Sequence, residues 1–381
     1  MEYQTPEDSS GKRKGLRICF AGGGTGGHLF PGLAIADEIR RRIPDAEITF
    51  IGTKQKIEAR VVPQRGYNFV PIWISGFRRS LKLSNLLFPV KVAVSLVQSF
   101  FLMKKMKPDV VVGTGGYVCG PPLYLATMLG IPTLIQEQNS YPGVTTRRLA
   151  HRVDEVHLSF ESSRRYLRRF DNVWVSGNPT RATLGTVSRE AGAEKFGIDP
   201  AITTLLVFGG SLGATSLNNE VARALPDLLR LGIQLIWQTG EGDFERIAAF
   251  AESLSQDANR RVRVLKFIEN MEYAYAAADI VACRAGASTL AELTVVGLAS
   301  VLVPYPFAAA NHQEENARAM VEAEAAVMVR DKELKDQFLA AVAGLITDTA
   351  KRNIMSEKAK ALGKREAAST LADAVMRLAK A

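Results

Sequence analysis

The sequence has few cysteines and no pattern that would join them. Cys19, Cys119 and Cys283 are far apart, odd in number and form no CxxC pair. We therefore expect neither a disulfide framework nor a zinc site, and the chain suits a reducing cytoplasm. The sequence also has no GxxxxGK[ST] pattern, which excludes a P-loop. It has no DxD pattern or His/Asp/Glu cluster, so we do not expect a metal that bridges a nucleotide diphosphate.

Acidic residues are absent from one long stretch, from Ala59 to Pro108, although nine basic residues lie there. The chain has 48 basic and 39 acidic residues, a net charge of +9, so the remainder balances at 39 against 39. A uniformly basic coat for nucleic acid is therefore excluded, and the excess is one local feature. The basic residues of this stretch are Arg60, Arg65, Arg78, Arg79, Lys82, Lys91, Lys104, Lys105 and Lys107.

Long apolar runs are also scarce, and the one that occurs, Leu86 to Met103, lies within the acid-free stretch. It is about long enough to span a bilayer. Pro89 and Lys91 interrupt it, however, and a charge near the centre of a span is costly. We expect a buried helix with one end facing a membrane instead. Residues 1–15 are polar, without a signal-peptide run, and are expected to form a flexible extension.

Composition and periodicity predict a two-domain α/β protein. Short apolar runs alternate with longer helical patterns, which is typical of βα units and parallel sheets. A break at Gly177–Pro179 separates two doubly wound halves, residues 16–177 and 178–359, and a C-terminal helix is expected over about 360–381. The expected strands are Leu16–Ala21, Ile48–Ile51, Val110–Val112, Pro132–Gln136, Val156–Leu158, Val173–Val175, Thr204–Phe208, Gln234–Gln238, Val262–Phe267, Ile280–Cys283 and Ser300–Val303. Ligands bind such sheets at the carboxyl ends of the strands.

A glycine-rich loop, Gly22–Gly27, follows the first expected strand. It satisfies GxGxxG, but the second strand ends in Ile51-Gly52-Thr53, without the acidic residue that favours a dinucleotide. Because its five glycines exceed what a turn needs, we favour an anion-binding loop, with a turn-only role and a nicotinamide site as alternatives. His28 follows the loop, before a helix expected from about Leu29. A lone histidine is often structural, but here a neutral imidazole could accept a hydroxyl proton.

Other loops carry polar groups at strand ends. Gly113–Tyr117 could share a diphosphate pocket with the first loop or be an ordinary turn, and Glu137–Asn139 suits the hydroxyls or amide of a sugar. In the second half, Ala287–Thr289 would begin a helix that holds a phosphate. Glu292, about one turn later, would then bind ribose hydroxyls, or else cap the helix. Arg181 could stabilise a diphosphate leaving group.

Together, seven ordered motifs resemble the MurG family of bacterial N-acetylglucosaminyltransferases. They span about Leu16 to the mid-330s and read GGGTGGHLFPGLAIADEI, GTGGYVCGPP, QEQNSYPGVTTRRLA, SGNPTR, FGGSLGATSLNN, CRAGASTLAELTVVGL and NHQEENA. The resemblance implies a GT-B fold, an α/β architecture of two Rossmann-like doubly wound parallel-sheet domains facing a cleft. Residues 16–177 would form the acceptor and membrane-associating domain, with the C-terminal helix packing back on it. Residues 178–359 would bind the UDP-sugar donor.

The resemblance also implies a reaction. N-acetylglucosamine would move from UDP-N-acetylglucosamine to the 4-hydroxyl of the muramoyl sugar of lipid I, with inversion, forming lipid II for peptidoglycan. No metal or other cofactor would take part. Three positions depart from the family pattern: Gln136 stands where His is frequent, Cys119 where Ser is frequent, and His312 where Gln is frequent.

Site residues follow from the matched motifs. His28 is the first candidate for the catalytic base and Glu137 the second. The implied donor-binding residues are Thr25, Gly26, Gly27, Asn139, Arg181, Ser211, Ile268 (through its backbone), Ala287, Ser288, Thr289, Leu290, Ala291, Glu292 and Gln313. Those expected at the acceptor diphosphate are Gly23, Gly24, Gly115, Gly116 and Tyr117.

The basic stretch gives the expected location. Apolar side chains there could enter a leaflet while cations meet anionic lipid heads, or the stretch could be a solvated basic face over a core helix. The expected membrane patch is Phe77, Arg78, Arg79, Leu81, Lys82, Leu83, Leu87 and Phe88. The protein would then be peripheral on the cytoplasmic face of the plasma (inner) membrane, with cell-wall synthesis and division proteins among its partners and no nucleic acid. Alternatives are a diacylglycerol glycosyltransferase, a UDP-N-acetylglucosamine 2-epimerase and a non-catalytic module that binds RNA or anionic surfaces.

Overall fold

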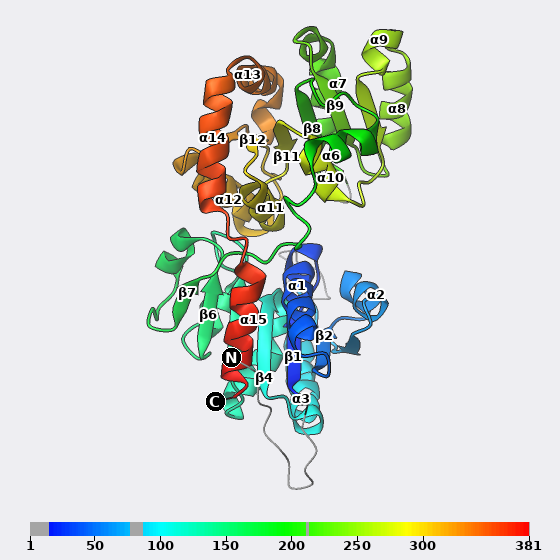
Figure 1. Cartoon of the computed structure of the whole chain (residues 1–381). Helices are drawn as coiled ribbons and strands as arrows, with labels where there is room; N and C mark the ends of the chain where they lie inside the picture. The colour runs from blue at the N-terminus through cyan, green and yellow to red at the C-terminus, as the bar shows by residue number, and fades with distance from the viewer. Residues whose placement is uncertain (1–14, 77–86, 211–212, 381) are drawn as a thin grey trace. The chain divides into compact units, whose positions relative to one another are not determined.

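A computed structural model of the chain describes residues 15–76, 87–210 and 213–380. The chain divides into two compact units (Figure 1). Unit 1 extends to Thr180 and resumes at Glu366, and unit 2 is Arg181–Arg365. Each unit is built around its own parallel sheet. The expectation of two doubly wound parallel α/β halves is therefore confirmed.

The sheet of unit 1 has seven parallel strands in the order β3-β2-β1-β4-β5-β6-β7. The strand order reverses between β1 and β4, and this reversal is where doubly wound sheets form ligand sites. The strands are β1 (Arg17–Gly22), β2 (Glu47–Gly52), β3 (Asn68–Pro71), β4 (Val110–Gly115), β5 (Thr133–Glu137), β6 (Glu155–Leu158) and β7 (Val173–Val175).

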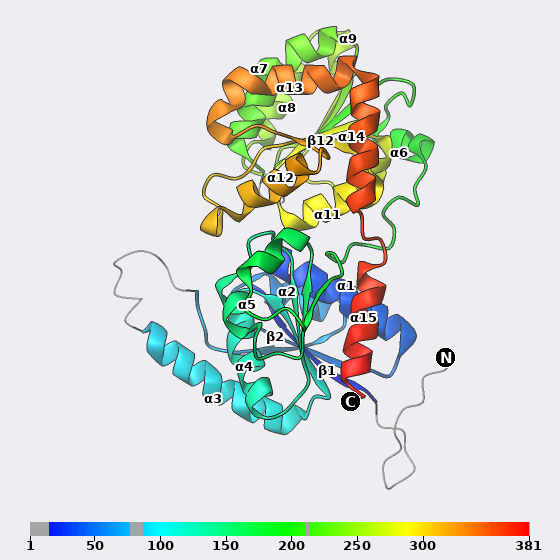
Figure 2. The same cartoon turned by 90° about the vertical axis from the view of Figure 1, so that its left-hand side faces the viewer.

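Helices cover both faces of this sheet, as Figure 2 shows for α4 on one face and α1 with α15 on the other. Side chains alternate along a strand, so Ile18 and Phe20 of β1 pack with α1 and α15, whereas Cys19 and Ala21 pack with α3 and α4. The helices of unit 1 are α1 (Gly26–Arg42), α2 (Ile57–Gln64), α3 (Phe88–Met106), α4 (Gly120–Met128), α5 (Val144–Leu149) and α15 (Ala367–Leu378), with short 3-10 helices at Tyr117–Cys119 and Glu161–Tyr166.

Helix α15 completes unit 1 although it follows unit 2 in the chain. It lies beside α1 (Figure 1), and its residues Leu371 and Val375 are fully buried in the core. Arg42 of α1 donates to the hydroxyl of Ser369 at 2.6 Å. The helix expected over about 360–381 corresponds to α15, which begins at Ala367, because α14 (Thr349–Leu362) ends before Gly363 and belongs to unit 2.

The sheet of unit 2 has six parallel strands in the order β10-β9-β8-β11-β12-β13, and its strand order reverses between β8 and β11. The strands are β8 (Thr204–Phe208), β9 (Gln234–Gln238), β10 (Val262–Leu265), β11 (Ile280–Cys283), β12 (Ala299–Leu302) and β13 (Val327–Met328). The helices are α6 (Arg189–Phe196), α7 (Thr215–Arg230), α8 (Phe244–Glu252), α9 (Gln256–Asn259), α10 (Met271–Ala277), α11 (Ala287–Val296), α12 (His312–Glu322), α13 (Leu334–Thr347) and α14.

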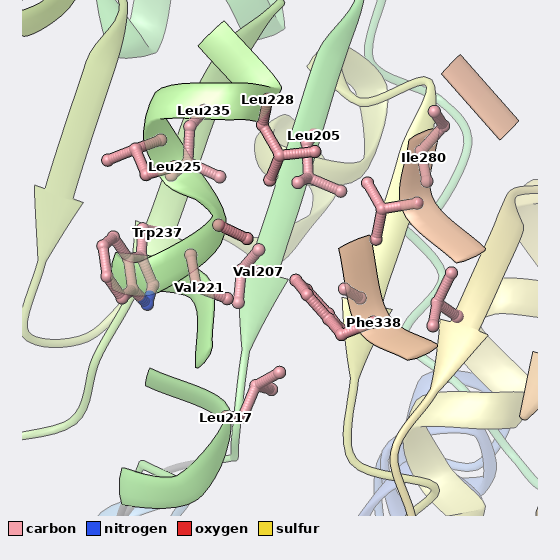
Figure 3. Packing of buried hydrophobic residues seen from close by; sticks show 14 of the residues in the cluster. Leu205, Val207, Leu217, Val221, Leu225, Leu228, Leu235, Trp237, Ile280 and Phe338 are labelled. Carbon is pink, nitrogen blue, oxygen red and sulfur yellow. The ribbon is translucent and has the colours of Figure 1, made fainter. Parts of the chain in front are cut away.

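Large apolar side chains fill the core of unit 2 between the sheet and its helices. Leu205 and Val207 of β8 pack with Trp237 of β9, Leu225 of α7 and Phe338 of α13 (Figure 3). All five side chains are fully buried. The indole N–H of Trp237 still has a partner, because it donates to Asn218 Oδ1 at 3.0 Å.

Helix α3 corrects one expectation, because it is not a buried helix. Its buried residues are Ser95, Ser99 and Met103. The hydroxyls of Ser95 and Ser99 donate to the carbonyls of Val92 and Ser95, at 2.8 and 2.7 Å, so these polar side chains are satisfied within the helix and can face the protein. Val97 and Phe101 point outward and are 56% and 66% exposed. Within the described residues, we find no helix whose length and apolar content suffice for a membrane span.

Candidate active site

The two glycine loops of unit 1 meet at the reversal of strand order. Gly22, at the end of β1, pairs with Gly115, at the end of β4. The imidazole of His28, half-buried in the first turn of α1, lies against Gly115. A Cβ on Gly115 would stand 2.6 Å from His28 Nδ1. The absence of a side chain at Gly115 therefore makes room for the imidazole.

The imidazole of His28 contacts a side chain at a neighbouring strand end, that of Gln138. His28 Nδ1 lies 2.9 Å from Gln138 Oε1. Gln138 follows β5 and is almost completely buried. Its Nε2 donates to the backbone carbonyls of Thr114, at 2.8 Å, and Gln136, at 3.0 Å. The residue that contacts the candidate base therefore belongs to the motif whose polar groups were expected to suit a sugar.

Glu137, the second candidate for the base, is occupied within its own loop. Its Oε1 accepts from the backbone N–H of Asn139 at 3.1 Å and from the side-chain amide at 3.3 Å. Its Oε2 accepts from the Gly143 N–H at 3.0 Å and the Thr146 hydroxyl at 2.6 Å. The carboxylate is buried. This arrangement holds the loop from Asn139 to Gly143 against α5, and both oxygens of the carboxylate already accept two hydrogen bonds each.

Glu58 of α2 was not singled out from the sequence, yet it anchors the first glycine loop. Its fully buried carboxylate accepts from the N–H of Gly24 at 3.0 Å. It also accepts from the N–H and hydroxyl of Thr53, at 3.1 and 2.8 Å. The N–H of Gly24 is thus used inside the protein. An anion at this loop would have to be held by the uncapped first turn of α1, which contains Gly26 and Gly27 and has no acidic residue.

Tyr117 lies beside the same loop. A Cβ on Gly24 would stand 3.5 Å from the Tyr117 ring, so the ring borders the loop directly. Burial raises the pKa of the Tyr117 hydroxyl, and the nearby Glu58 carboxylate adds to that rise while a hydrogen bond with Thr53 opposes it. Tyr117 is therefore a neutral hydroxyl near neutral pH. Gly116, in the left-handed region at φ 79°, precedes it.

In unit 2, the N-terminus of α11 has the features of an anion site. It follows β11 at the reversal of strand order, and its N-cap residue, Gly286, makes no side-chain cap. Among the described residues, the buried hydroxyl of Ser288 has no hydrogen-bond partner. A buried hydroxyl without a partner costs free energy, and a ligand oxygen would satisfy it. Ala287 and Leu290 are buried, so their side chains serve the core and only their backbone can address a ligand.

Glu292 lies one turn into α11 and has two partners from elsewhere in unit 2. Tyr275 of α10 donates its hydroxyl to Glu292 Oε2 at 2.8 Å, and Arg181 Nη2 lies 3.7 Å from Oε1. Burial raises the pKa of the Glu292 carboxyl, whereas Arg181 and Tyr275 oppose that rise. Arg181 also lies 3.6 Å from Glu272. Sequence reasoning named Glu292 and Arg181 but missed Tyr275.

Two other expected donor-binding residues, Ile268 and Gln313, make hydrogen bonds within unit 2. The N–H of Ile268 donates to Gln238 Oε1 at 2.8 Å. Its carbonyl is therefore the backbone group that remains to bind the nucleobase of the donor. Gln313 Oε1 accepts from the N–H of Tyr305 at 2.9 Å. Thr25 is exposed at the N-terminus of α1, and Thr289 and Ala291 are half-buried on α11.

Several expected positions lie outside the described residues. They are Ser211 in the donor set and Phe77, Arg78, Arg79, Leu81, Lys82 and Leu83 in the membrane patch. Leu87 and Phe88 of that patch are described, at the N-terminus of α3, where Leu87 is 50% exposed. No group of three or more His, Cys, Asp or Glu side chains that could hold a metal ion occurs in the described part of the chain.

Comparison with known proteins defines the class. The N-terminal domain of glycosyltransferase family 28 matches residues 18–158, and the C-terminal domain of the same family matches residues 204–371. The protein is therefore a family 28 glycosyltransferase with the GT-B fold. A solved UDP-N-acetylglucosamine 2-epimerase also shares the fold, with a TM-score of 0.63 at 15% identity over 95% of this chain and 96% of that one. At that identity the likeness extends to the fold alone.

Nearer relatives define the family within the class. A Chlorobaculum tepidum protein described as a UDP-N-acetylglucosamine–N-acetylmuramyl-(pentapeptide) pyrophosphoryl-undecaprenol N-acetylglucosamine transferase is 46% identical over 370 residues, covering 96% of this chain and 100% of the relative. The solved structure of Acinetobacter baumannii MurG superposes with a TM-score of 0.75 at 27% identity, covering 95% and 99% of the two chains. The chain belongs to the MurG family of N-acetylglucosamine transferases.

Proposed function

We propose that the protein transfers N-acetylglucosamine from UDP-N-acetylglucosamine to the 4-hydroxyl of the muramoyl sugar of lipid I, forming lipid II. The observation that carries this proposal is the 46% identity to a transferase of that description over the relative's full length. The local geometry supports it, because His28 and the N-terminus of α11 both lie where their sheets reverse strand order.

The reaction we propose is a direct displacement at the anomeric carbon of the donor. The acceptor oxygen forms the new bond from the face opposite the leaving group, which inverts the configuration. The bond from the anomeric carbon to the diphosphate oxygen breaks, and its electron pair leaves with UDP. The proton of the acceptor hydroxyl passes to a base.

His28 is our choice for that base. Its imidazole is half-buried at the mouth of the glycine loops, and Nδ1 is engaged by Gln138, which leaves Nε2 as the atom that can take a proton. All four contacts of the Glu137 carboxylate are internal, so we assign Glu137 to holding its loop and not to the chemistry. A positioned general base contributes about 10²–10⁴-fold to the rate.

The negative charge on the departing UDP would be stabilised by unit 2. The uncapped N-terminus of α11 and the buried hydroxyl of Ser288 suit the diphosphate, and the guanidinium of Arg181 adds a fixed positive charge. Glu292 would accept hydrogen bonds from the ribose hydroxyls, and the Ile268 carbonyl would bind the nucleobase of the donor. In this arrangement the charge of the leaving group is met by a helix terminus and an arginine.

We also propose peripheral attachment to the cytoplasmic face of the inner membrane. Helix α3 supports it, because Val97 and Phe101 are exposed and Lys104 and Lys105 follow them in the last turn. An apolar surface beside cations suits the interface of an anionic leaflet. Interactions with cell-wall synthesis and division proteins stay a prediction.

The test of the function is transfer of radiolabelled N-acetylglucosamine from UDP-N-acetylglucosamine to a lipid I analogue, with and without a chelator. We expect label in the lipid I product at equal rates in both conditions. The His28→Ala variant should lose about 10²–10⁴-fold in kcat while its KM for the donor stays near that of the wild type. Transfer to diacylglycerol but not to lipid I would overturn the proposed acceptor. Normal turnover in His28→Ala with lost donor binding would overturn the role of His28.

A further inference from the structure

The side-chain amide of Gln138 can point only one way. Its Nε2 lies within hydrogen-bond distance of three oxygens: the carbonyls of Thr114 and Gln136, at 2.8 and 3.0 Å, and the side-chain Oε1 of Gln136. Rotating the amide by 180° would set its oxygen against two backbone carbonyls, which have no proton to give. The amide oxygen of Gln138 must therefore face His28.

The side chain of Gln136 supports this orientation of Gln138 on the side away from His28. Its own Nε2 is directed to oxygen atoms of Ser159, Gly177 and Asn178, at 3.2, 3.4 and 3.4 Å, so its Oε1 faces Gln138. Gln136 and Gln138 are both buried. The two glutamines thus form a directional chain of donors and acceptors that ends at the imidazole.

The orientation of Gln138 decides which nitrogen of His28 carries the proton. An amide oxygen has no hydrogen to donate, so the 2.9 Å contact to His28 Nδ1 requires a proton on Nδ1. In the neutral imidazole, Nε2 is then unprotonated. Gly115 contributes by leaving room, since a Cβ there would lie 2.6 Å from Nδ1 and 3.2 Å from Gln138 Oε1.

We propose that Gln138 is a positioning residue, whose amide oxygen accepts the Nδ1–H of His28 and holds the neutral imidazole in the tautomer with a free Nε2. The tautomer of His28 follows from the contacts of Gln138 and Gln136 alone. The further statement that Nε2 takes the acceptor proton rests on the proposed function. Gln138 itself acts through His28 and does not contact the reacting atoms.

Two variants separate orientation from simple packing. Gln138→Met keeps the length of the side chain but removes the acceptor and the amide donors. Gln138→Glu, with its carboxyl protonated, keeps an oxygen that can accept from Nδ1 and an O–H that can donate to the carbonyl of Thr114 or Gln136. Imidazole ¹⁵N NMR of the full chain without substrate distinguishes the two neutral tautomers. The chain has four histidines, and the spectrum of His28→Gln assigns the signal of His28. Thermal unfolding of each variant verifies that it is folded.

We expect the wild type and Gln138→Glu to show the Nδ1–H tautomer, and Gln138→Met to lose it. In the transfer assay, kcat of Gln138→Met should fall by about 10–100-fold, less than the 10²–10⁴-fold expected for loss of the base itself, with the donor KM little changed. Gln138→Glu should recover a large part of that loss. A wild-type Nε2–H tautomer, or an Nδ1–H tautomer that persists in Gln138→Met, would overturn the orienting role.

The two proposals can fail separately. A wild type that carries the Nδ1–H tautomer but transfers no sugar to lipid I would overturn the proposed function and uphold the orienting role of Gln138. An active wild type whose kcat is the same in folded Gln138→Met would overturn the catalytic consequence of that role.

Discussion

Gly115 is the residue whose missing side chain matters most for the candidate base. It adopts φ 104°, and a Cβ there would stand 2.6 Å from His28 Nδ1. Gly115→Ala should displace the imidazole and lower kcat at least as much as Gln138→Met does. The matched control is Gly130→Ala, which has φ 68° and nothing within 4 Å, so it should cost about 1–2 kcal/mol of strain without changing kcat. Equal activity of the two variants in the transfer assay would contradict the steric argument.

We expect the buried carboxylate of Glu292 to lower the stability of the folded state while it strengthens the binding of UDP. Burial raises the pKa of its carboxyl above the ordinary value of 4.5, so the folded state holds its proton more tightly than the unfolded state does. The stability that the protonated form contributes is present below about pH 4.5 and is lost as pH rises through the raised pKa. Glu292→Gln removes this loss. The thermal stability of the variant should therefore improve, relative to the wild type, as pH rises above about 4.5.

The same variant should bind UDP less tightly. A hydrogen bond to a charged group is worth about 1.5–3 kcal/mol, so the dissociation constant of UDP should rise by roughly 10–100-fold in isothermal titration calorimetry. Glu322→Gln, which neutralises an exposed carboxylate on α12, is the control for the loss of one charge. Unchanged UDP affinity in Glu292→Gln would contradict a ribose-binding role.

Sequence reasoning found the site residues that carry a local signal and missed those that do not. His28 was found because it follows a glycine loop at an expected strand end, and Glu292 because it lies about one turn into a helix expected after a strand. Glu58 reaches Gly24 across 34 positions, and Tyr275 reaches Glu292 across 17. Neither belongs to a motif, and only the packing of α2 and α10 brings them to the site. Contacts of this kind depend on tertiary structure, which no local pattern encodes.

At the scale of elements, strong hydrophobic patterns were sufficient to predict strands from the sequence, and weak patterns were not. The expected strand over Thr204–Phe208 is confirmed with the same bounds as β8, because five buried apolar or β-branched residues precede a glycine pair. β3 and β13 were missed, since β3 is a partly exposed edge strand of four residues and β13 has only two. A helix was expected at the position of α3, but its expected burial was wrong. Its apolar content suggested a core helix, whereas small serines form the inward face.

The exposed face of α3 should bind membranes without supporting the fold. Replacing Val97 and Phe101 by Ser should change the free energy of unfolding by only about 0.5 kcal/mol, because both side chains are exposed. Binding to vesicles with anionic lipids should weaken, by roughly 1.5–3 kcal/mol for the phenyl ring if it is buried in the leaflet. Co-sedimentation with such vesicles measures this.

Charge on the same helix gives a second readout of that interaction. Lys104→Gln with Lys105→Gln should reduce vesicle binding at low salt by about 1 kcal/mol per lysine, and added salt should remove the difference. Ile354→Ser, which deletes an apolar side chain that is 56% exposed on α14, is the control and should leave binding unchanged. Vesicle binding that is indifferent to the α3 substitutions, or insensitive to salt, would contradict attachment through this helix.

At the scale of the whole molecule, unit 2 is inserted in the sequence between two segments of unit 1. Unit 1 takes its last helix from the far end of the chain, after all of unit 2. Besides its apolar face, α15 contributes Arg377, which donates to Glu155 of β6 at 2.6 Å, and that carboxylate also contacts the buried His157 at 2.9 Å. The core of unit 1 is therefore incomplete until α15 has been synthesised, although unit 2 has all of its own elements earlier.

This insertion predicts that a cavity in α15 destabilises unit 1 selectively. Leu371 is fully buried beside α1, so Leu371→Ala should cost about 2–5 kcal/mol. Hydrogen exchange followed by mass spectrometry should show faster exchange in peptides of β1, β4 and α1, while peptides of β8 and α7 keep their protection. Leu362→Ala is the matched control, because Leu362 is 41% exposed at the end of α14 in unit 2 and should change stability by only about 0.5 kcal/mol. Equal loss of protection in both units would mean that the chain unfolds as one cooperative body and that α15 stabilises more than the unit it completes.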